Sequence, residues 1–349
     1  MPFTKPIIII LIVAALLAGA GIYVGKHAGK LRFTASTGPG AGQNSNAQNM
    51  DQIQLQNLGK APDFTGIDHW LNTSGPLTIS DLKGKVVLVD FWTFSCINCI
   101  RTLPYVTKWY DTYHDKGLVV VGVHTPEFPF EKVTTNVQDA INRYGIHYPV
   151  AQDNEYQTWN NYGNQYWPAE YLIDQNGNVV YTHFGEGNYD HTENAIRQLL
   201  GLNTEQMQTS DDHLNQVGSP EMYFGTDRLQ NLIDSQQPSA VPKDYVYPQN
   251  LDLNSFALSG NWSFAPDHIE LNKPGGGIKL KFHSGKVFMV AQSAKPVTLK
   301  IKVDGKDQPD VAVSGSQLYT LFDSGDYADH QLEISIPDPG LQAFTFTFG

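Results

Sequence analysis

Continuous apolar runs and helical patterns alternate between residues 58 and 202. The runs KVVLVDFW (85–92) and LVVVGV (118–123) are short and β-branched, which is typical of strands buried on both faces. Residues 97–114 carry apolar side chains at helical spacing, and NVQDAINRYG and HTENAIRQLLGL continue that pattern further on. AEYLID and NVVYTHF flank a QNG turn and predict a hairpin. This order predicts an α/β sheet covered on both faces.

The pattern changes in the last third of the chain. Residues 203–245 are polar and rich in loop-forming residues, so we interpret them as a connecting segment. Over residues 246–349, apolar and polar side chains alternate with a period of two, as in GIKLKF, VTLKIKV, LEISI and FTFTF. Short alternating strands between Gly, Pro and Asp turns predict an antiparallel β-sandwich.

The N-terminal segment has a different character. Residues 7–25 contain no charged side chain, and this length approaches the roughly 20 residues that span a bilayer as a helix. We interpret residues 1–32 as a single-span anchor that leaves the following domains outside the cytoplasm. A cleaved signal peptide with small residues at Ala18 and Ala20 is the alternative. Residues 33–57, rich in Gly, Ser, Asn and Gln, predict a flexible linker.

Composition narrows the range of functions. The chain of 349 residues is 41% apolar and 17% charged, which is typical of globular protein. A net charge of −12 argues against a nucleic-acid partner, because phosphate binding needs a basic surface. Two cysteines are too few for a disulfide-rich scaffold, but they are enough for one redox centre.

Those two cysteines, Cys96 and Cys99, form a C-x-x-C motif between a predicted strand and a predicted helix. Cys96 then lies at the helix N-terminus, where unpaired amides and the helix dipole stabilise a thiolate. Cys99 lies one turn further and can attack a mixed disulfide formed on Cys96. A zinc site would need two more ligands at suitable spacing, and a structural disulfide closing so short a loop would stabilise little. The motif therefore favours a redox pair.

Ionisable residues follow or interrupt the two buried strands. Asp90 stands inside KVVLVDFW, where a buried carboxyl group is costly without a role, although a satisfied strand-end carboxylate is the alternative. His124 and Glu127 follow the second strand, at the sheet edge where sites are often built. A capped loop explains these two residues equally well.

The segments VDFWTFSCINCIRTLP and QYWPAEYLID resemble the active-site sequences of thioredoxins. The resemblance implies that Asp90 is the buried acid that exchanges protons with Cys99. It places Trp92 on the tryptophan ahead of the motif and Pro104 on the helix-kink proline. It places Pro168 on the cis-proline that lies against the disulfide and shapes the substrate groove.

A wider resemblance covers residues 58–349. The redox domain, SPEMYFG and the terminal strands are together similar to the extracytoplasmic C-terminal part of DipZ-type proteins. Those proteins also carry a multi-helix electron-transfer domain, so the resemblance implies a separate membrane electron donor of the CcdA/DsbD type. Two departures matter: Ile97 and Asn98 replace the Gly-Pro of typical thioredoxins, and Thr102 stands where related cytochrome-maturation reductases have an acid.

These observations predict a membrane-tethered extracytoplasmic thiol-disulfide oxidoreductase, and more specifically a reductase. Its cofactor is expected to be only the Cys96–Cys99 disulfide, and its partners are expected to be protein disulfides. One alternative is a redoxin-type peroxidase, for which Thr93 matches the family pattern but Val89 replaces a proline. The other is a surface glycan-binding protein, because the C-terminal domain resembles carbohydrate-binding modules and offers Trp262 or Tyr319 for sugar stacking. The supporting site residues are Trp92, Pro168, Pro104, Asn98 and Glu127.

Overall fold

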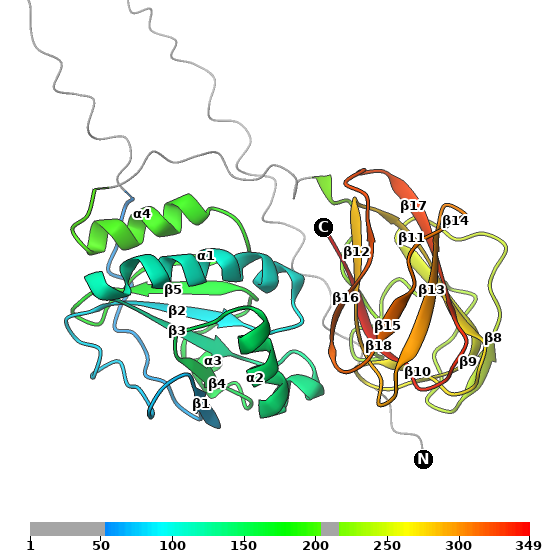
Figure 1. Cartoon of the computed structure of the whole chain (residues 1–349), viewed down its shortest axis with the longest axis horizontal. Helices are drawn as coiled ribbons and strands as arrows, with labels where there is room; N and C mark the ends of the chain where they lie inside the picture. The colour runs from blue at the N-terminus through cyan, green and yellow to red at the C-terminus, as the bar shows by residue number, and fades with distance from the viewer. Residues whose placement is uncertain (1–52, 204–215) are drawn as a thin grey trace, which may run out of the picture. The chain divides into compact units, whose positions relative to one another are not determined.

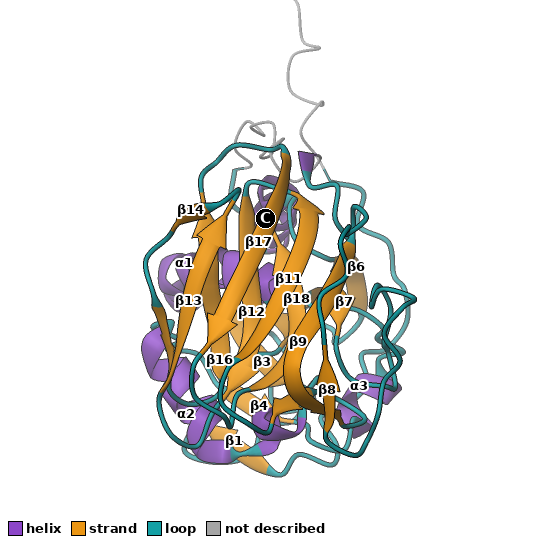
Figure 2. Ribbon diagram, turned by 90° about the vertical axis from the view of Figure 1, so that its right-hand side faces the viewer, coloured by secondary structure: helices purple, strands orange, loops and turns teal. Residues whose placement is uncertain are grey.

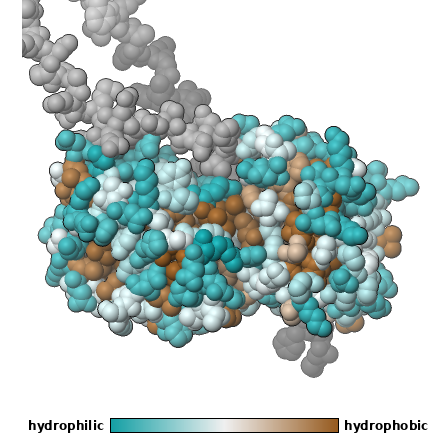
Figure 3. Space-filling view, viewed as in Figure 1, coloured by the Kyte–Doolittle hydropathy of each residue, from teal (hydrophilic) through white to brown (hydrophobic). Residues whose placement is uncertain are grey.

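The computed structural model describes residues 53–203 and 216–349 (Figure 1). The anchor predicted for residues 1–32 lies outside the described residues, as do residues 33–52 of the predicted linker. Within the described part of the chain, no helix combines the length and the apolar character needed to cross a membrane. On the face seen in Figure 3, hydrophilic residues are interspersed with apolar ones.

A six-stranded sheet with the order β1-β4-β3-β2-β5-β6 forms the first domain. The two apolar runs found in the sequence make its central pair of parallel strands, β2 and β3. β5 joins β2 in antiparallel fashion and makes the predicted hairpin with β6. The strands are β1 (His69–Leu71), β2 (Val86–Trp92), β3 (Leu118–His124), β4 (Val150–Gln152), β5 (Ala169–Ile173) and β6 (Val179–Phe184).

Both faces of this sheet are covered, as the sequence predicted. The apolar core on one face includes side chains from the three longest helices, and α1 and α4 lie side by side over this face in Figure 1. The other face packs against α3 and against apolar side chains of residues 61–82, most of which are in loops. The helices are α1 (Ile97–Tyr113), η1 (His114–Lys116), η2 (Pro129–Lys132), α2 (Thr134–Arg143), α3 (Gln157–Asn161) and α4 (Tyr189–Leu199).

An antiparallel β domain with a sandwich-like core follows. The long strand β9 pairs with β11 through its first half and with β10 through its second half, so it connects two layers (Figure 2). The main path of its sheet is β14-β13-β17-β11-β9-β10-β18-β12-β16. The strands are β9 (Ser255–Phe264), β10 (Ile269–Leu271), β11 (Gly276–His283), β12 (Lys286–Gln292), β13 (Val297–Val303), β14 (Lys306–Asp307), β15 (Val311–Val313), β16 (Gln317–Asp323), β17 (Asp329–Ile336) and β18 (Gln342–Phe348).

The alternating side chains of β11 point into the core as expected, since Ile278, Leu280 and Phe282 are fully buried. The alternating apolar side chains of β13 are buried in the same core. Trp262 is buried as well, and its indole N–H donates to the Ser259 carbonyl at 2.7 Å. Tyr319 is 6% exposed. Neither aromatic side chain therefore presents a ring face for sugar stacking, and that part of the glycan-binding alternative is wrong.

Two further strands lie in the segment that the sequence suggested was only a connection. β7 (Met222–Tyr223) pairs with β18, and β8 (Lys243–Tyr245) pairs with β9. Met222 and Phe224 are fully buried in the β-domain core. The short SPEMYFG segment therefore contributes to the β domain as well as connecting to it.

Candidate active site

The C-x-x-C motif lies where β2 leads into α1. Cys96 is the N-cap of α1, and its Sγ accepts the backbone N–H of Cys99 at 3.4 Å. Both cysteines are free thiols; Cys96 is partly exposed, whereas Cys99 is 1% exposed. Burial, followed by the hydrogen bond to Cys96, raises the pKa of Cys99 well above its usual range. One accessible thiol and one shielded, protonated thiol are the arrangement that disulfide exchange needs.

The loop before β5 lies against Cys96. The Trp167–Pro168 peptide bond is cis, as the thioredoxin resemblance implied. The Cys96 thiol lies 3.9 Å from the Trp167 carbonyl, and the Trp167 indole N–H donates to the Thr125 carbonyl at 3.0 Å. The proline loop and the end of β3 thus fix one side of the exposed sulfur.

Exposed aromatic side chains extend this side of the site. Tyr166, just before the cis bond, is 51% exposed, and Phe184 at the end of β6 is 45% exposed. Their ring centroids are 5.2 Å apart. This pair exposes apolar surface beside the proline loop.

Asp90 lies on the face of β2 that α1 covers. It is 1% exposed, and its Oδ1 atom has no hydrogen-bond partner among the described residues. Burial raises the pKa of Asp90 from 3.8 to about 7. Its charge is also one of the influences that raise the pKa of Cys99, so the two groups are close enough to interact. The carboxyl group can therefore accept the Cys99 proton near neutral pH.

Trp92 is a core residue at the end of β2. It is fully buried and meets His124 edge to face, with ring centroids 5.1 Å apart. Burial lowers the pKa of His124 to about 3, so this histidine is neutral and does not act as an acid or base at ordinary pH. Gly122 permits the packing, because a Cβ there would lie 3.0 Å from both the Trp92 Nε1 and the Tyr148 ring.

Glu127 follows β3, and its carboxylate is already paired. Its Oε1 atom lies 2.7 Å from the Arg228 guanidinium and accepts the Tyr223 hydroxyl at 2.9 Å. The Arg228 guanidinium also lies over the Tyr223 ring, 3.7 Å from its centroid. These partners are about 100 residues away in sequence, so no local pattern indicated the pairing.

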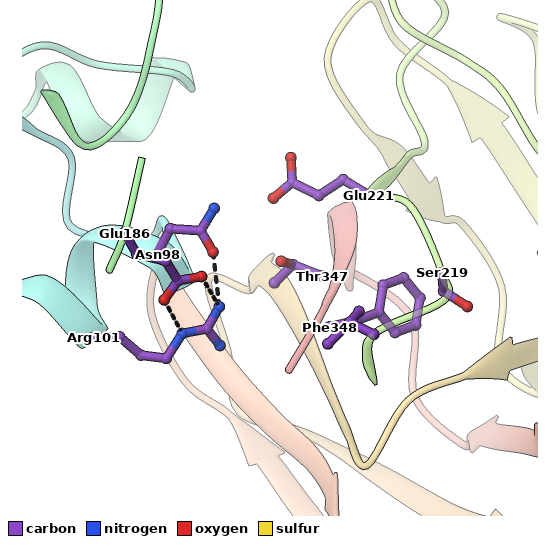
Figure 4. A pocket seen from close by; sticks show the side chains of 8 residues that line it. Asn98, Arg101, Glu186, Ser219, Glu221, Thr347 and Phe348 are labelled. Carbon is purple, nitrogen blue, oxygen red and sulfur yellow. Dashed lines mark hydrogen bonds and ion pairs between the residues drawn. The ribbon is translucent and has the colours of Figure 1, made fainter. Parts of the chain in front are cut away.

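Asn98 and Arg101 border a pocket of about 190 Å³ beside the first turn of α1 (Figure 4). The Arg101 guanidinium donates to both oxygens of Glu186, at 2.6 and 2.7 Å, and to the Asn98 Oδ1 at 2.8 Å. Asn98 is thus held in place between the two cysteines by Arg101. The other lining residues are Val217, Ser219, Glu221, Thr347 and Phe348. Pro104 lies further along α1 and is exposed, so its effect is confined to the helix backbone.

Glu131 was not among the site residues predicted from the sequence. This residue of η2 is completely buried, and its Oε1 accepts the Ser95 hydroxyl at 2.6 Å and the Ser95 N–H at 3.3 Å. Its Oε2 accepts the N–H groups of Glu127 at 2.5 Å and Phe128 at 2.9 Å. Burial and then the charge of Glu127 raise the pKa of Glu131 to about 7. The carboxyl group therefore anchors the residue that precedes Cys96.

Glu170 was also missed. It is 1% exposed on β5 and lies directly opposite Asp90 in the strand register. Its Oε2 accepts the Thr192 hydroxyl at 2.8 Å. Burial and then the charge of Asp90 raise the pKa of Glu170 to about 8. The sequence does carry a signal for Glu170, a glutamate inside the apolar AEYLID strand. It is the same kind of signal that pointed to Asp90.

Comparisons with known proteins agree with this geometry. Residues 57–200 match the Redoxin family, and residues 219–349 match the family described as a thioredoxin-like C-terminal domain. The chain therefore carries thioredoxin-like domains. Protein DipZ of Mycobacterium tuberculosis is 42% identical over 307 residues, which are 85% of this chain and 44% of DipZ. The predicted resemblance to DipZ is thus confirmed, although this thioredoxin-like chain spans less than half the length of that relative.

Smaller relatives match only the first domain. The thiol-disulfide oxidoreductase ResA of Bacillus anthracis is 29% identical over 149 residues, 43% of this chain and 82% of ResA. A solved thiol:disulfide interchange protein of the thioredoxin family from Chlorobium tepidum is 26% identical. It covers 41% of this chain and 96% of its own, with a TM-score of 0.35.

Proposed function

We propose that this chain is a thiol-disulfide oxidoreductase in which Cys96 and Cys99 alternate between dithiol and disulfide. The observation that carries the proposal is the pairing of a partly exposed Cys96 at the α1 N-cap with a buried Cys99 whose N–H bonds to its sulfur. The name of ResA supports the same chemistry.

In the reductive direction, the Cys96 thiolate attacks one sulfur of a substrate disulfide. A mixed disulfide forms, and the first substrate thiolate leaves and takes up a proton. The Cys99 thiol then passes its proton to the Asp90 carboxylate, and the Cys99 thiolate attacks the Cys96 sulfur. The second substrate thiol is released, and two electrons have moved from the protein dithiol to the substrate. A dithiol donor must then reduce the Cys96–Cys99 disulfide.

The physiological setting that we propose is extracytoplasmic, with residues 1–32 as the membrane anchor and protein disulfides as substrates. The apolar run at residues 7–25 and the similarity to DipZ support this setting. A membrane protein of the CcdA/DsbD type would supply electrons. In the reductive direction, the raised pKa of Asp90 allows the carboxylate to take the proton of Cys99 during resolution.

The peroxidase alternative gains no support from the site. The Thr93 side chain is completely buried, and its hydroxyl lies 3.4 Å from the His124 Nε2. This hydroxyl is therefore engaged with the ring of His124. A peroxidatic threonine would need to face the substrate bound at the reactive sulfur.

Trapping of the mixed disulfide tests the proposed function. Cys99→Ser removes the attacking thiol, so adducts linked through Cys96 should accumulate in the native host and disappear on addition of reductant. Cys96→Ser should yield few adducts, because Cys99 is 1% exposed. Identification of the adducts by mass spectrometry would name substrates and the electron donor. The absence of adducts from both variants, with both proteins folded, would contradict the proposal.

A further inference from the structure

Three titratable side chains form a row across the first sheet. Asp90 on β2 lies directly opposite Glu170 on β5, and Glu170 lies directly opposite His183 on β6. Directly opposed residues of antiparallel strands project from the same face, with Cβ atoms about 4.5–5.5 Å apart. Leu88 and Leu172, two positions away on β2 and β5, belong to the core that also holds Cys99. The row therefore faces the side of the sheet on which the resolving thiol lies.

The two acids are buried with few partners. Asp90 and Glu170 are each 1% exposed, and Asp90 Oδ1 and Glu170 Oε1 have no hydrogen-bond partner among the described residues. His183 does not supply a strong counter-charge, because burial lowers its pKa and favours its neutral form. Cys99 interacts with Asp90, and Tyr148 interacts with both acids. Tyr181 interacts with Glu170, Tyr144 with Cys99, and His191 with His183. Tyr110, Tyr113 and Tyr189 are further ionisable side chains packed on this core.

Two carboxylates in this position cannot both be ionised at low cost. Like charges directly opposed on a sheet repel each other, and burial disfavours the charged form of each acid. Burial raises the pKa of Asp90 to about 7, and burial together with the Asp90 charge raises that of Glu170 to about 8. At neutral pH the pair therefore retains a proton, and its ionisations belong to the pair and not to either residue alone.

A hydrogen-bonded path leads from the pair toward the surface. The Thr192 hydroxyl donates to Glu170 Oε2 at 2.8 Å, and the Tyr181 hydroxyl lies 3.3 Å from the Thr192 hydroxyl. Since Thr192 donates to Glu170, Tyr181 is the donor to Thr192. Tyr181 is only partly buried. Both hydroxyl groups can pass protons along this path, which begins on the carboxyl group that lies farther from Cys99.

We propose that Asp90 and Glu170 form a proton-sharing pair, in which Glu170 is a positioning residue that acts on Cys99 through Asp90 and exchanges protons with solvent through Thr192 and Tyr181. This inference rests on the proposed function. During resolution the Cys99 thiol gives its proton to the pair, which becomes fully protonated. The Cys99 thiolate then forms the bond to the Cys96 sulfur, and the substrate thiolate leaves. The pair returns one proton along the path.

The test uses the reduced full chain mixed rapidly with 5,5′-dithiobis(2-nitrobenzoate). The first release of coloured thiol reports attack by Cys96, and the second reports resolution by Cys99. We expect the second rate of the wild type to show two carboxyl ionisations between about pH 5 and 9. Glu170→Gln, which keeps an acceptor for Thr192, should leave a single ionisation in the pH profile of the second release. That ionisation should lie at least about one pH unit below the higher of the two wild-type ionisations. The first release should keep its pH dependence.

Control variants separate this role from a structural one. Glu193→Gln changes a carboxylate on the same helix as Thr192 that binds Trp109 and Tyr113, so it should leave the profile unchanged. Thr192→Val should keep both ionisations and slow the second release. If Glu170→Gln does not fold, Glu170→Asp should retain two ionisations at shifted pH values. A Glu170→Gln profile that superimposes on the wild type, or a Glu170→Asp profile with one step, would overturn the inference. A wild type without a second release would instead contradict the proposed function.

Discussion

Asp90→Asn should stabilise the first domain, and the gain should depend on pH. The substitution keeps the shape of the side chain and removes its charge. In the folded protein burial raises the pKa of Asp90 from 3.8 to about 7. The unfolded chain therefore releases this proton near pH 4, whereas the folded chain holds it until about pH 7.

The size of the effect follows from that difference. A separation of about three pKa units corresponds to roughly 4 kcal/mol, at about 1.4 kcal/mol for each unit. Below pH 4 the aspartate is protonated in both states and costs nothing. As the pH rises from 4 to 7, only the unfolded state gains charge, so the wild type loses stability. Above pH 7 both states are ionised and the loss is constant. Asparagine removes this loss, so the variant should gain up to about 4 kcal/mol at pH 8 and little at pH 4.

Urea unfolding followed by tryptophan fluorescence at pH 4 and pH 8 measures the difference between variant and wild type. Asp174→Asn is the matched control. Slight burial of Asp174 raises its pKa, but the hydrogen bonds from Asn178 and Asn176 outweigh burial and lower it overall. A carboxyl group with a lowered pKa stabilises the folded protein at pH values above its usual pKa, and this stabilisation is lost in acid. Asp174→Asn should therefore destabilise the protein at pH 8.

An Asp90→Asn gain that is equal at pH 4 and pH 8 would refute the electrostatic argument. The same variant should slow the second thiol release by about 100-fold, the lower end for loss of a general base, while the first release is unaffected. Unchanged resolution together with the expected gain in stability would show that the carboxyl group is buried without a catalytic role.

Two more substitutions test the packing around the motif. Gly122→Ala should cost about 1–3 kcal/mol in urea unfolding, because its Cβ would press on the Trp92 Nε1 and the Tyr148 ring, and a variant as stable as the wild type would contradict that contact. Glu131→Gln turns an amide NH₂ toward two of the four donors, so it should cost about 1–3 kcal/mol and slow the first thiol release. Ser95→Ala, which removes one of those donors, is the control variant for Glu131→Gln. An unchanged rate of the first thiol release in Glu131→Gln would refute the anchoring role of Glu131.

The central strands and the motif could be predicted because their signals are local. A continuous apolar run identifies β2 and β3, and a pair of cysteines after such a run identifies the reactive turn. The short strand His69–Leu71 could not be predicted, because three residues give no periodicity and its position depends on pairing with β4. In the same way, Met222 and Phe224 lie in a polar segment and become core residues only through β18.

The acids of the site show the same limit. Asp90 interrupts an apolar run and was selected for that reason, and Glu170 carries the same signal in a strand where no cysteine drew attention to it. Glu131 lies in a short 3₁₀ helix with no apolar pattern, and its four donors come from residues up to 36 positions away. Glu127 was selected for its place after β3, but its ion pair with Arg228 depends on the fold of the second domain.

The ionised form of the buried acids, which the proposed chemistry needs, is also the form that lowers the stability of the fold. Burial raises the pKa of Asp90 and of Glu131 to about 7, and that of Glu170 to about 8. Each of them lowers the stability of the folded domain as the pH rises from about 4 toward these values, because the unfolded chain loses its protons first. In the proposed mechanism, resolution by Cys99 needs an ionised Asp90, so the rate of resolution should rise over the same interval. For Glu131, four hydrogen-bond donors offset the free-energy cost of burying the carboxylate. Among the described residues, the pair of Asp90 and Glu170 has only one donor, the hydroxyl of Thr192, which binds Glu170. The proton transfer that we propose would explain why a poorly compensated pair lies next to the resolving thiol, because the pair does not stabilise the fold.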